Sequence, residues 1–364
     1  MANMKQIAEL AGVSLGTVSH VLNNSAKVRE PLRKRVLAAV QSTDYQPSQL
    51  ARALRRDKTN IIAMIIPDIV NPFFPSVVRG AEDVAFANGY RLILCNTDND
   101  HAKELAHLSA LQTYLPSGLI VIPSNFSELA AQAEIYRKAG SAVVCIDRLP
   151  RNWTGDTVTI DNVKGTYRAT SYLIELGHRC LGAITGPLHL TNAQERMNGV
   201  KRAVRRAGLD VAPGYFQETT YDEAGGYSKT KILLRMLPRP TAIVACNDMI
   251  ALGALLAIRE EKLRCPEDIS LIGFDGLDLT EFTNPQLSTV YQSPYQLGAT
   301  SAQLVLDRLA DKTHPFRHIV LDTELKIRES IAPPAQAEKP AARSSLKKPS
   351  KSRVLVGAHT DFRQ

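Results

Sequence analysis

Apolar positions in residues 1–45 recur with the period of short helices, and this stretch contains no strand-like run. Asn3 and Gln6 form a capping-box pattern, Ser14 can cap a second helix, and Pro31 can open a third. The predicted apolar stripes are Ile7, Leu10 and Ala11, then Val18, Val21 and Leu22, and finally Leu32, Val36, Leu37 and Val40. Three small helices of this kind make one compact unit.

Residues 46–60 hold a single short apolar stripe. Pro47 marks its start, after which Leu50, Ala51 and Leu54 recur at helical spacing. Because a helix this short is marginal alone, we expect a hinge that folds only when something packs on it.

From Ile61 onward, strand-like runs alternate with amphipathic stretches of helical length. The runs are IIAMIIPD, YRLILCNTD, GLIVIP, AVVCIDR, TVTID, CLGAITG, YFQETTY, TAIVACND and ISLIGFDG. Repeated β-α units with apolar strands form parallel sheets covered on both faces, and nine strands are many for one sheet. We therefore expect an α/β core of two doubly wound parallel-sheet subdomains, with a break near Asp161. Two late runs, STVYQ and RHIVLDTELKIRES, should return strands across that break.

The net charge of +8 is unevenly distributed. Residues 1–60 hold ten Lys and Arg against four Asp and Glu, and residues 333–364 hold seven against two. The tail is rich in Pro, Ala, Ser and Lys and shows no apolar face, so we expect it to be disordered. A basic head and tail predict a polyanionic partner at the ends of the chain, although a solvated tail remains the alternative for residues 333–364.

Composition excludes several classes of protein. No apolar run approaches the ~20 residues that span a bilayer, and MANMKQIAEL lacks the basic and apolar regions of a signal peptide, so we expect a cytoplasmic protein without membrane contact. The five scattered cysteines contain no CxxC pair and are expected to be buried thiols. GGYSKT has the wrong spacing for a phosphate loop, and GxSxG and HExxH are absent. We expect no enzyme, no cofactor and no metal site.

A helix-turn-helix needs a small residue where two helices cross, a turn residue that tolerates positive φ, and a buried aliphatic on the second helix. Ala8, Gly12 and Val18 meet these needs at the right spacing. The second helix, within GVSLGTVSHVLN, would then lie in a DNA groove. A generic three-helix bundle is the alternative.

The stretch MKQIAELAGVSLGTVSHVLNNSAKV, followed by YQPSQLARAL and IIAMIIPDIVNPFF, resembles the lactose-repressor/galactose-repressor (LacI/GalR) family of bacterial transcription regulators. The resemblance spans about residues 3–330. It implies a headpiece at 1–45, a hinge at 46–60, and an effector-binding and dimerisation core at 61–332. The first subdomain would hold about 61–160 and 292–320, and the second about 161–291 and 321–332. The resemblance also implies a nucleoid-associated homodimer on a near-palindromic operator.

The family places Leu15, Gly16 and His20 at base edges in the major groove. Arg is frequent at the position of His20 and can make two hydrogen bonds to a guanine, whereas His makes at most one. Direct readout is therefore expected to be sparse. The resemblance implies that Leu54 wedges into a minor-groove base step and adds specificity, with ordinary packing on the core as the alternative. The remaining DNA contacts are expected from Lys5, Ser14, Thr17, Ser19, Lys27 and Arg29.

Polar residues at the ends of several predicted strands favour a small-molecule cleft between the subdomains. Carboxylates, amides and guanidinium groups suit sugar hydroxyls, and aromatic rings cover the C–H faces of a sugar. Similarity to the ribose-binding periplasmic protein extends the set to Asn71, Phe73, Phe74, Asp147, Arg148, Arg196, Tyr221, Asn247, Asp275 and Gln292. We expect a ribose-like pentose or a hexose as effector of a repressor of carbohydrate uptake or catabolism genes.

Alternatives remain at this stage. A purine or a phosphorylated sugar could be the effector, although Leu190 and Asn192 lack the basic character expected around the polar edge of a purine. A solute-binding protein would need a signal peptide, and a sugar-modifying enzyme would need an acid–base pair, which is not evident. Asp248, at a strand end, is better interpreted as a helix cap than as a ligand contact.

Overall fold

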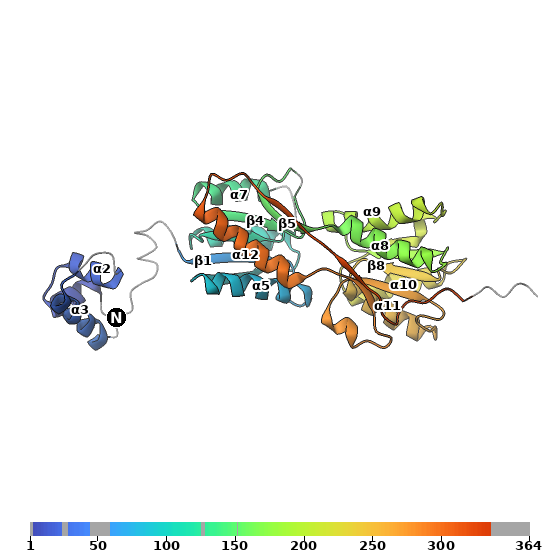
Figure 1. Cartoon of the computed structure of the whole chain (residues 1–364), viewed down its shortest axis with the longest axis horizontal. Coiled ribbons are helices and arrows are strands. Elements are labelled where there is room, and N and C mark those ends of the chain that lie inside the picture. Colours follow the sequence, from blue (N-terminus) through green and yellow to red (C-terminus); the bar gives the residue numbers. More distant parts are fainter. Residues whose placement is uncertain (1–2, 24–27, 44–58, 125–127, 151, 336–364) are drawn as a thin grey trace, which may run out of the picture. The chain divides into compact units, whose positions relative to one another are not determined.

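The computed structural model describes residues 3–23, 28–43, 59–124, 128–150 and 152–335 (Figure 1). The headpiece holds helices α1 (Met4–Ala11), α2 (Leu15–Asn23) and α3 (Glu30–Ser42). The Asn3 side chain accepts from the backbone N–H of Gln6, and the Gln6 side chain accepts from the N–H of Asn3, so the predicted capping box is confirmed. Gly12 ends α1 with φ +58°, and the Ser14 hydroxyl accepts from the N–H of Thr17 at 3.2 Å.

The buried faces of α1 and α3 differ from the predicted stripes. Leu10 and Leu37 are 64% and 46% exposed, while Ala8 and Ala39 are buried. Short helices that cross at close range bury small residues at the crossing, which turns the larger leucines outward. The headpiece core consists of Ile7, Ala8, Ala11, Val18, Val21, Val36 and Ala39.

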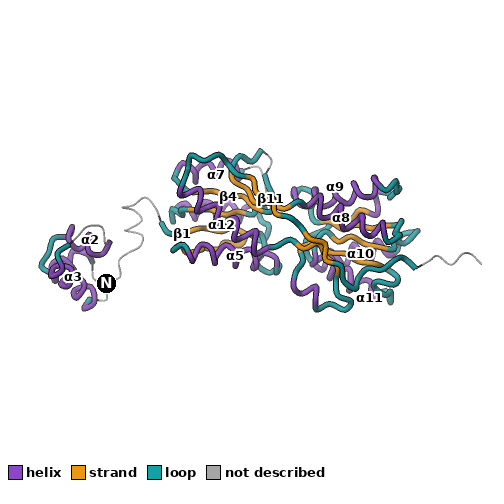
Figure 2. Tube along the Cα trace, viewed as in Figure 1, coloured by secondary structure: helices purple, strands orange, loops and turns teal. Residues whose placement is uncertain are grey.

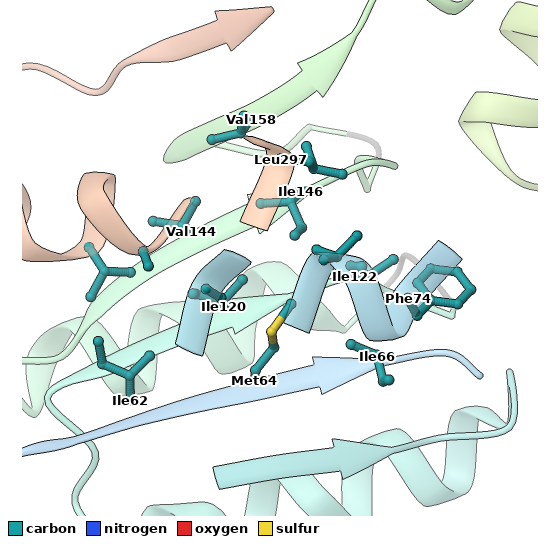
Figure 3. Close-up of a cluster of buried hydrophobic side chains, with 14 of the residues drawn as sticks. Ile62, Met64, Ile66, Phe74, Ile120, Ile122, Val144, Ile146, Val158 and Leu297 are labelled. Atoms are coloured by element: carbon teal, nitrogen blue, oxygen red, sulfur yellow. The ribbon is translucent and has the colours of Figure 1, made fainter. Parts of the chain in front are cut away.

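The first subdomain contains a six-stranded parallel sheet of order β11-β5-β4-β3-β1-β2. Its strands are β1 (Ile61–Ile66), β2 (Arg91–Asn96), β3 (Gly118–Val121), β4 (Ala142–Ile146), β5 (Asp156–Ile160) and β11 (His318–Leu321). Helices α5 (Phe73–Ala87) and α12 (Pro294–Ala310) cover one face, and α6 (His101–Gln112) and α7 (Leu129–Lys138) cover the other. Figure 3 shows Ile62, Met64 and Ile66 of β1 in the α5–α12 layer.

The second subdomain repeats this plan with the order β12-β10-β9-β8-β6-β7. Figure 2 shows it, like the first subdomain, as strands (orange) layered with helices (purple). The strands are β6 (Leu181–Thr185), β7 (Phe216–Glu218), β8 (Ala242–Ala245), β9 (Ser270–Asp275), β10 (Ser288–Tyr291) and β12 (Glu324–Lys326). Helices α8 (Asn162–Glu175) and α9 (Thr191–Arg206) pack on one face, and α10 (Glu223–Leu234) and α11 (Asp248–Glu260) pack on the other. β12 is antiparallel to β10, whereas the other strand pairs are parallel.

The chain passes between the two sheets three times: after β5, after β10, and between β11 and β12. Every strand-like run of the sequence forms a strand, and the late runs supply β10, β11 and β12. The predicted fold class is confirmed: an all-α headpiece is followed by an α/β core of two doubly wound sheets.

A buried ion pair ties α12 to β5. Nε and Nη2 of Arg308 donate to the two carboxylate oxygens of Asp156 at 2.8 and 2.9 Å, and the backbone N–H of Arg317 donates to the same carboxylate. These bonds join one of the late-returning segments to the body of the first subdomain.

Asp156→Ala is expected to lower the free energy of unfolding by about 3–5 kcal/mol, because it leaves the Arg308 guanidinium buried without its carboxylate. Urea denaturation measures the loss. Asp307→Ala is the matched control, since Asp307 pairs with Arg317 at a partly exposed site and should contribute under about 1 kcal/mol. Equal losses in the two variants would contradict this assignment.

Candidate DNA interface and effector site

The predicted DNA-contacting residues of the headpiece lie mainly at the surface. Leu15 is 47% exposed on the first turn of α2, and Lys5, Ser14 and Leu15 line one shallow groove. Gly16 and His20 are exposed farther along α2, Thr17 and Ser19 are half-buried, and Arg29 is exposed at the start of α3. Lys27 and Leu54 lie outside the described residues. The exposed part of α2 thus presents a leucine, a glycine and a histidine.

Nine of the ten predicted effector residues line one cavity of about 340 Å³. They come from both subdomains: Asn71, Phe73, Phe74, Asp147 and Arg148 from the first, and Arg196, Tyr221, Asn247 and Asp275 from the second. The volume is at the small end of the ~300–1,000 Å³ typical of small-molecule sites. Gln292 is not in the cavity wall; it lies behind Asp275 and donates from Nε2 to Oδ1 of that residue at 2.6 Å.

The sheet topology explains why these side chains meet. Asp147 follows β4, Asn247 follows β8, and Asp275 ends β9. Carboxyl ends of parallel strands share one edge of a sheet, so residues distant in sequence converge there. The backbone of Asp147 adopts φ +64° and that of Asp275 φ +117°, conformations that L-residues rarely adopt. Both pocket carboxylates are therefore held by their surroundings in strained backbone positions.

The carboxylate of Asp147 bridges the two subdomains. Its Oδ2 accepts from Nδ2 of Asn192, at the start of α9, at 3.0 Å, and a second bridge runs from the N–H of Leu149 to the Thr191 hydroxyl at 3.0 Å. Oδ1 of Asp147 is buried and has no hydrogen-bond partner among the described residues. Burial raises the pKa of this carboxyl, and the nearby Arg148 and Arg196 oppose the rise.

Arg148 is a buried guanidinium with few acceptors. Nη1 and Nη2 both donate to Oδ1 of Asn99, at 3.3 and 3.4 Å. Nε lies 3.7 Å from Oδ2 of Asp147 and has no hydrogen-bond partner in the described part of the chain. Burial lowers the pKa of Arg148, and the neighbouring Asp147 counteracts this. Arg148 can therefore donate hydrogen bonds to a ligand in the cavity.

Arg196 and Asp275 form the charged pair of the second subdomain. Nη1 of Arg196 is 3.1 Å from Oδ1 of Asp275 and donates to the Cys246 carbonyl at 2.7 Å. Nε donates to Oδ1 of Asn162 at 2.9 Å, and the guanidinium lies over the Phe274 ring. Burial raises the pKa of Asp275 to about 6, against the charge of Arg196.

Aromatic side chains supply the apolar part of the wall. The rings of Phe73 and Phe74 pack edge to face with centroids 5.2 Å apart. Across the cavity, the ring of Tyr221 lies against Gly186, where a Cβ atom would come within 2.3 Å of it. The Tyr221 hydroxyl is buried without a hydrogen-bond partner in the described ranges.

Sequence reasoning missed part of the wall. The additional lining residues are Asp68, Asp98, Asn99, Ser124, Pro187, His189, Leu190, Asn192, Thr220 and Asp222. Asp68, Asp98 and Asn99 follow β1 and β2, so the strand-end rule that identified Asp147 could have found them as well. From the sequence, Leu190 and Asn192 are only an argument against a purine, and no pattern predicts that they line the cavity.

The interpretation of Asp248 as a helix cap is wrong. Asn247 is the N-cap of α11, and its side chain accepts from the N–H of Ile250 at 2.8 Å. Asp248 lies in the first turn and is fully buried, and its oxygens accept from the Thr289 hydroxyl and the N–H of Leu277. Burial, and then the charge of Asp275, raise the pKa of Asp248 to about 8. The carboxylate of Asp248 is thus bound by β10 and by the turn after β9, and it does not cap the helix.

Two family descriptions match the chain. "Bacterial regulatory proteins, lacI family" matches residues 3–48, and "Periplasmic binding protein-like domain" matches residues 170–331. The HTH-type transcriptional repressor PurR of Pasteurella multocida is 36% identical over 331 residues, 91% of this chain and 99% of that repressor. The chain therefore belongs to the lacI family of bacterial regulatory proteins, and it is a DNA-binding transcriptional repressor.

Solved structures agree with this assignment. A LacI-family transcriptional regulator from Enterococcus faecium with bound ribose is 31% identical, with a TM-score of 0.68 over 75% of this chain and 99% of that one. The lac repressor dimer bound to operator and the anti-inducer ONPF has a TM-score of 0.78 over 91% of this chain and 99% of that one; at 24% identity it shows the fold alone. Across the described residues, no helix is both long enough and apolar enough to cross a membrane.

The raised pKa values predict how stability depends on pH. A carboxyl group whose pKa is higher in the folded chain binds its proton more tightly there, so stability is lost as the pH rises from the unfolded value of about 4 toward the folded value. We expect the free energy of unfolding to fall between about pH 4 and pH 8. Asp248→Asn should make this fall with pH less steep, since one group contributes at most ~1.4 kcal/mol per pH unit to it.

Urea denaturation at a series of pH values measures both slopes. Asp278→Asn is the control because Asp278 is a neighbouring exposed carboxylate. If Asp248→Asn and Asp278→Asn change the pH dependence alike, burial of Asp248 is not its cause.

Proposed function

We propose that this repressor is controlled by a monosaccharide bound in the cavity between its subdomains. The proposal rests on one observation. Two buried carboxylates and two buried guanidinium groups surround the cavity, and each subdomain contributes one of each. A carboxylate only accepts hydrogen bonds and a guanidinium only donates them, whereas each sugar hydroxyl does both. A ring with hydroxyls around its whole perimeter can satisfy Asp147 and Arg148 on one side and Arg196 and Asp275 on the other.

The charge of the wall disfavours a phosphorylated sugar. Five aspartates and two arginines line the cavity. Some of the aspartates are already engaged: Asp98 pairs with Lys103, and Asp222 caps α10. Their charges nevertheless leave an acidic wall, which repels an anionic ligand. A neutral ligand fits this field better.

A second candidate is the same regulator with a purine effector. It rests on similarity to repressors named PurR, a name that points to purines. A purine has flat apolar faces and concentrates its polar atoms on its edges. Leu190 and Asn192 add no basic group at the start of α9, and the charged residues lie on both sides of the cavity. The geometry therefore favours the sugar.

We further propose a homodimer that binds a near-palindromic operator in the cytoplasm and represses genes for carbohydrate uptake or catabolism. The lac repressor, whose fold this chain shares, was solved as a dimer on its operator. Effector and operator would act on one equilibrium, so each must change the affinity of the other by the same factor.

The effector proposal predicts that D-ribose, another pentose or a hexose stabilises the full chain. At 100 times its dissociation constant a ligand adds about 2.7 kcal/mol, which raises the melting temperature by a few degrees. Ribose 5-phosphate, guanine and hypoxanthine should not do so. Arg148→Met should abolish the shift, and Arg264→Met, which removes an exposed arginine of the second subdomain, should leave it intact.

The outcome also separates the two candidates. A melting-temperature shift with purines alone would replace the sugar by the purine effector and leave the DNA-binding role unchanged. A sugar shift that survives in Arg148→Met would show that the sugar binds elsewhere.

The exposed residues of α1 and α2 predict two different DNA phenotypes. Lys5→Ala should weaken binding to operator and to unrelated DNA alike and lower the salt slope by about 1, because a phosphate contact carries no sequence information. His20→Ala should weaken operator binding alone, by no more than the ~1–3 kcal/mol of a good base contact. Fluorescence anisotropy measures both affinities, with an operator selected from a random library and with scrambled DNA for comparison. If His20→Ala loses the same affinity for both DNAs, His20 contacts a phosphate and not a base.

A further inference from the structure

Asp248 is a buried carboxylate that no ion pair explains. Its side chain is fully buried, and no Lys, Arg or His of the described residues lies within 4 Å of its oxygens as a salt-bridge partner. Oδ1 accepts from the Thr289 hydroxyl at 2.6 Å and Oδ2 accepts from the N–H of Leu277 at 2.8 Å. Gly273 makes room for the carboxylate, since a Cβ atom there would lie 2.2 Å from Oδ1. A carboxyl group buried without a cation is costly unless hydrogen bonds satisfy its polar atoms, so its contacts must matter to the structure around it.

The contacts of Asp248 fix the turn that follows β9, residues 275–277. Asp275 and Gly276 both have positive φ, +117° and +75°. A side chain at Gly276 is also excluded by space, because its Cβ would lie 2.7 Å from the Cα of Tyr291. Such a backbone persists only when its surroundings hold it. Asp248 does so from one side and β10, through Thr289 and Tyr291, from the other.

The two ends of this turn have different partners. Asp275 lines the cavity and pairs with Arg196. Leu277, two residues later, is buried in the apolar cluster of the first subdomain together with Met249, the neighbour of Asp248 on α11. That cluster also contains Phe73 and Phe74, which line the cavity from the other subdomain. A single segment therefore carries both a cavity contact and an apolar contact between subdomains.

We infer that Asp248 is a positioning residue that makes these two contacts act as one unit. By holding the N–H of Leu277, it fixes the distance between the carboxylate of Asp275 and the Leu277–Met249 side chains that join the subdomains. Occupation of the cavity and closure of the subdomains are then coupled through a rigid turn. The inference rests on the proposed effector site but does not depend on which effector occupies it.

Three variants of the full chain test the inference, with D-ribose as the probe in titration calorimetry. Asp248→Ala removes both acceptors, and Leu277→Ala removes the closure contact; neither residue lines the cavity. Each should weaken ribose binding about tenfold, and the double variant should be no weaker than either single one, because both break the same unit. Asp248→Asn should retain most of the affinity, since its amide oxygen still accepts from Leu277 and its nitrogen can donate to the Thr289 hydroxyl.

Leu233→Ala is the control for a merely structural effect. Leu233 is as buried as Leu277 but packs in the α10–α11 layer of the second subdomain. This variant should lower the melting temperature without changing ribose affinity. If Asp248→Ala behaves like Leu233→Ala, or if the losses in the double variant multiply to a hundredfold, the turn does not couple the two contacts.

Hydrogen exchange without ligand separates this inference from the choice of effector. Asp248→Ala should speed amide exchange in residues 276–280 and also in the first turns of α5, residues 73–78, whereas Leu233→Ala should not affect α5. If ribose fails to bind the unmodified chain but this pattern appears, the effector assignment fails and the coupling stands. If exchange in α5 is unchanged by Asp248→Ala, the coupling is wrong whatever the effector.

Discussion

The cleft depends on the burial of ionised side chains at the carboxyl ends of two parallel sheets. Burying a charge is unfavourable unless opposite charges and hydrogen-bond partners surround it. Arg196 and Asp275 satisfy each other within the second subdomain, whereas Asp147 receives its hydrogen bond across the cleft from Asn192. The partners of the first subdomain's charges are thus incomplete without the second. This dependence makes a ligand, whose polar groups can complete both sets, an effective link between the subdomains.

The headpiece and the core solve different recognition problems. The DNA contacts proposed for α2 include few side chains able to distinguish bases, so we expect much of the affinity for DNA to come from phosphate contacts, which position the protein without specifying sequence. The cavity, in contrast, collects buried donors and acceptors from the ends of several strands and from α9, an arrangement suited to one small molecule. The proposed function therefore places recognition of the effector in the core and leaves DNA specificity to a small number of contacts and to DNA shape.

The coupling proposed for Asp248 connects the cavity to the subdomain interface through a short stretch of backbone. Asp275 and Leu277 are separated by one residue, and positive φ values at Asp275 and Gly276 leave the connecting backbone little freedom. In this coupling, a movement of the Asp275 carboxylate therefore displaces Leu277. The strain at Asp275 is consistent with a site where conformation has been fixed for function rather than for stability alone.

The sequence by itself determined the local elements of this protein. Asn3 with Gln6, Gly12 and Pro31 set helix ends through hydrogen bonds and φ preferences within a few residues, and the apolar runs formed every strand. The strand-end rule also brought Asp147, Arg148, Asn247 and Asp275 to one cavity. Tertiary structure decided the rest, as Leu10 and Leu37 turned outward because helix crossings favoured alanines. Gln292 lies behind Asp275 and not in the cavity wall, and Asp248 does not cap its helix but accepts a hydrogen bond from Leu277, 29 residues away. Such outcomes depend on contacts between segments far apart in the chain, whose relative energies no local pattern records.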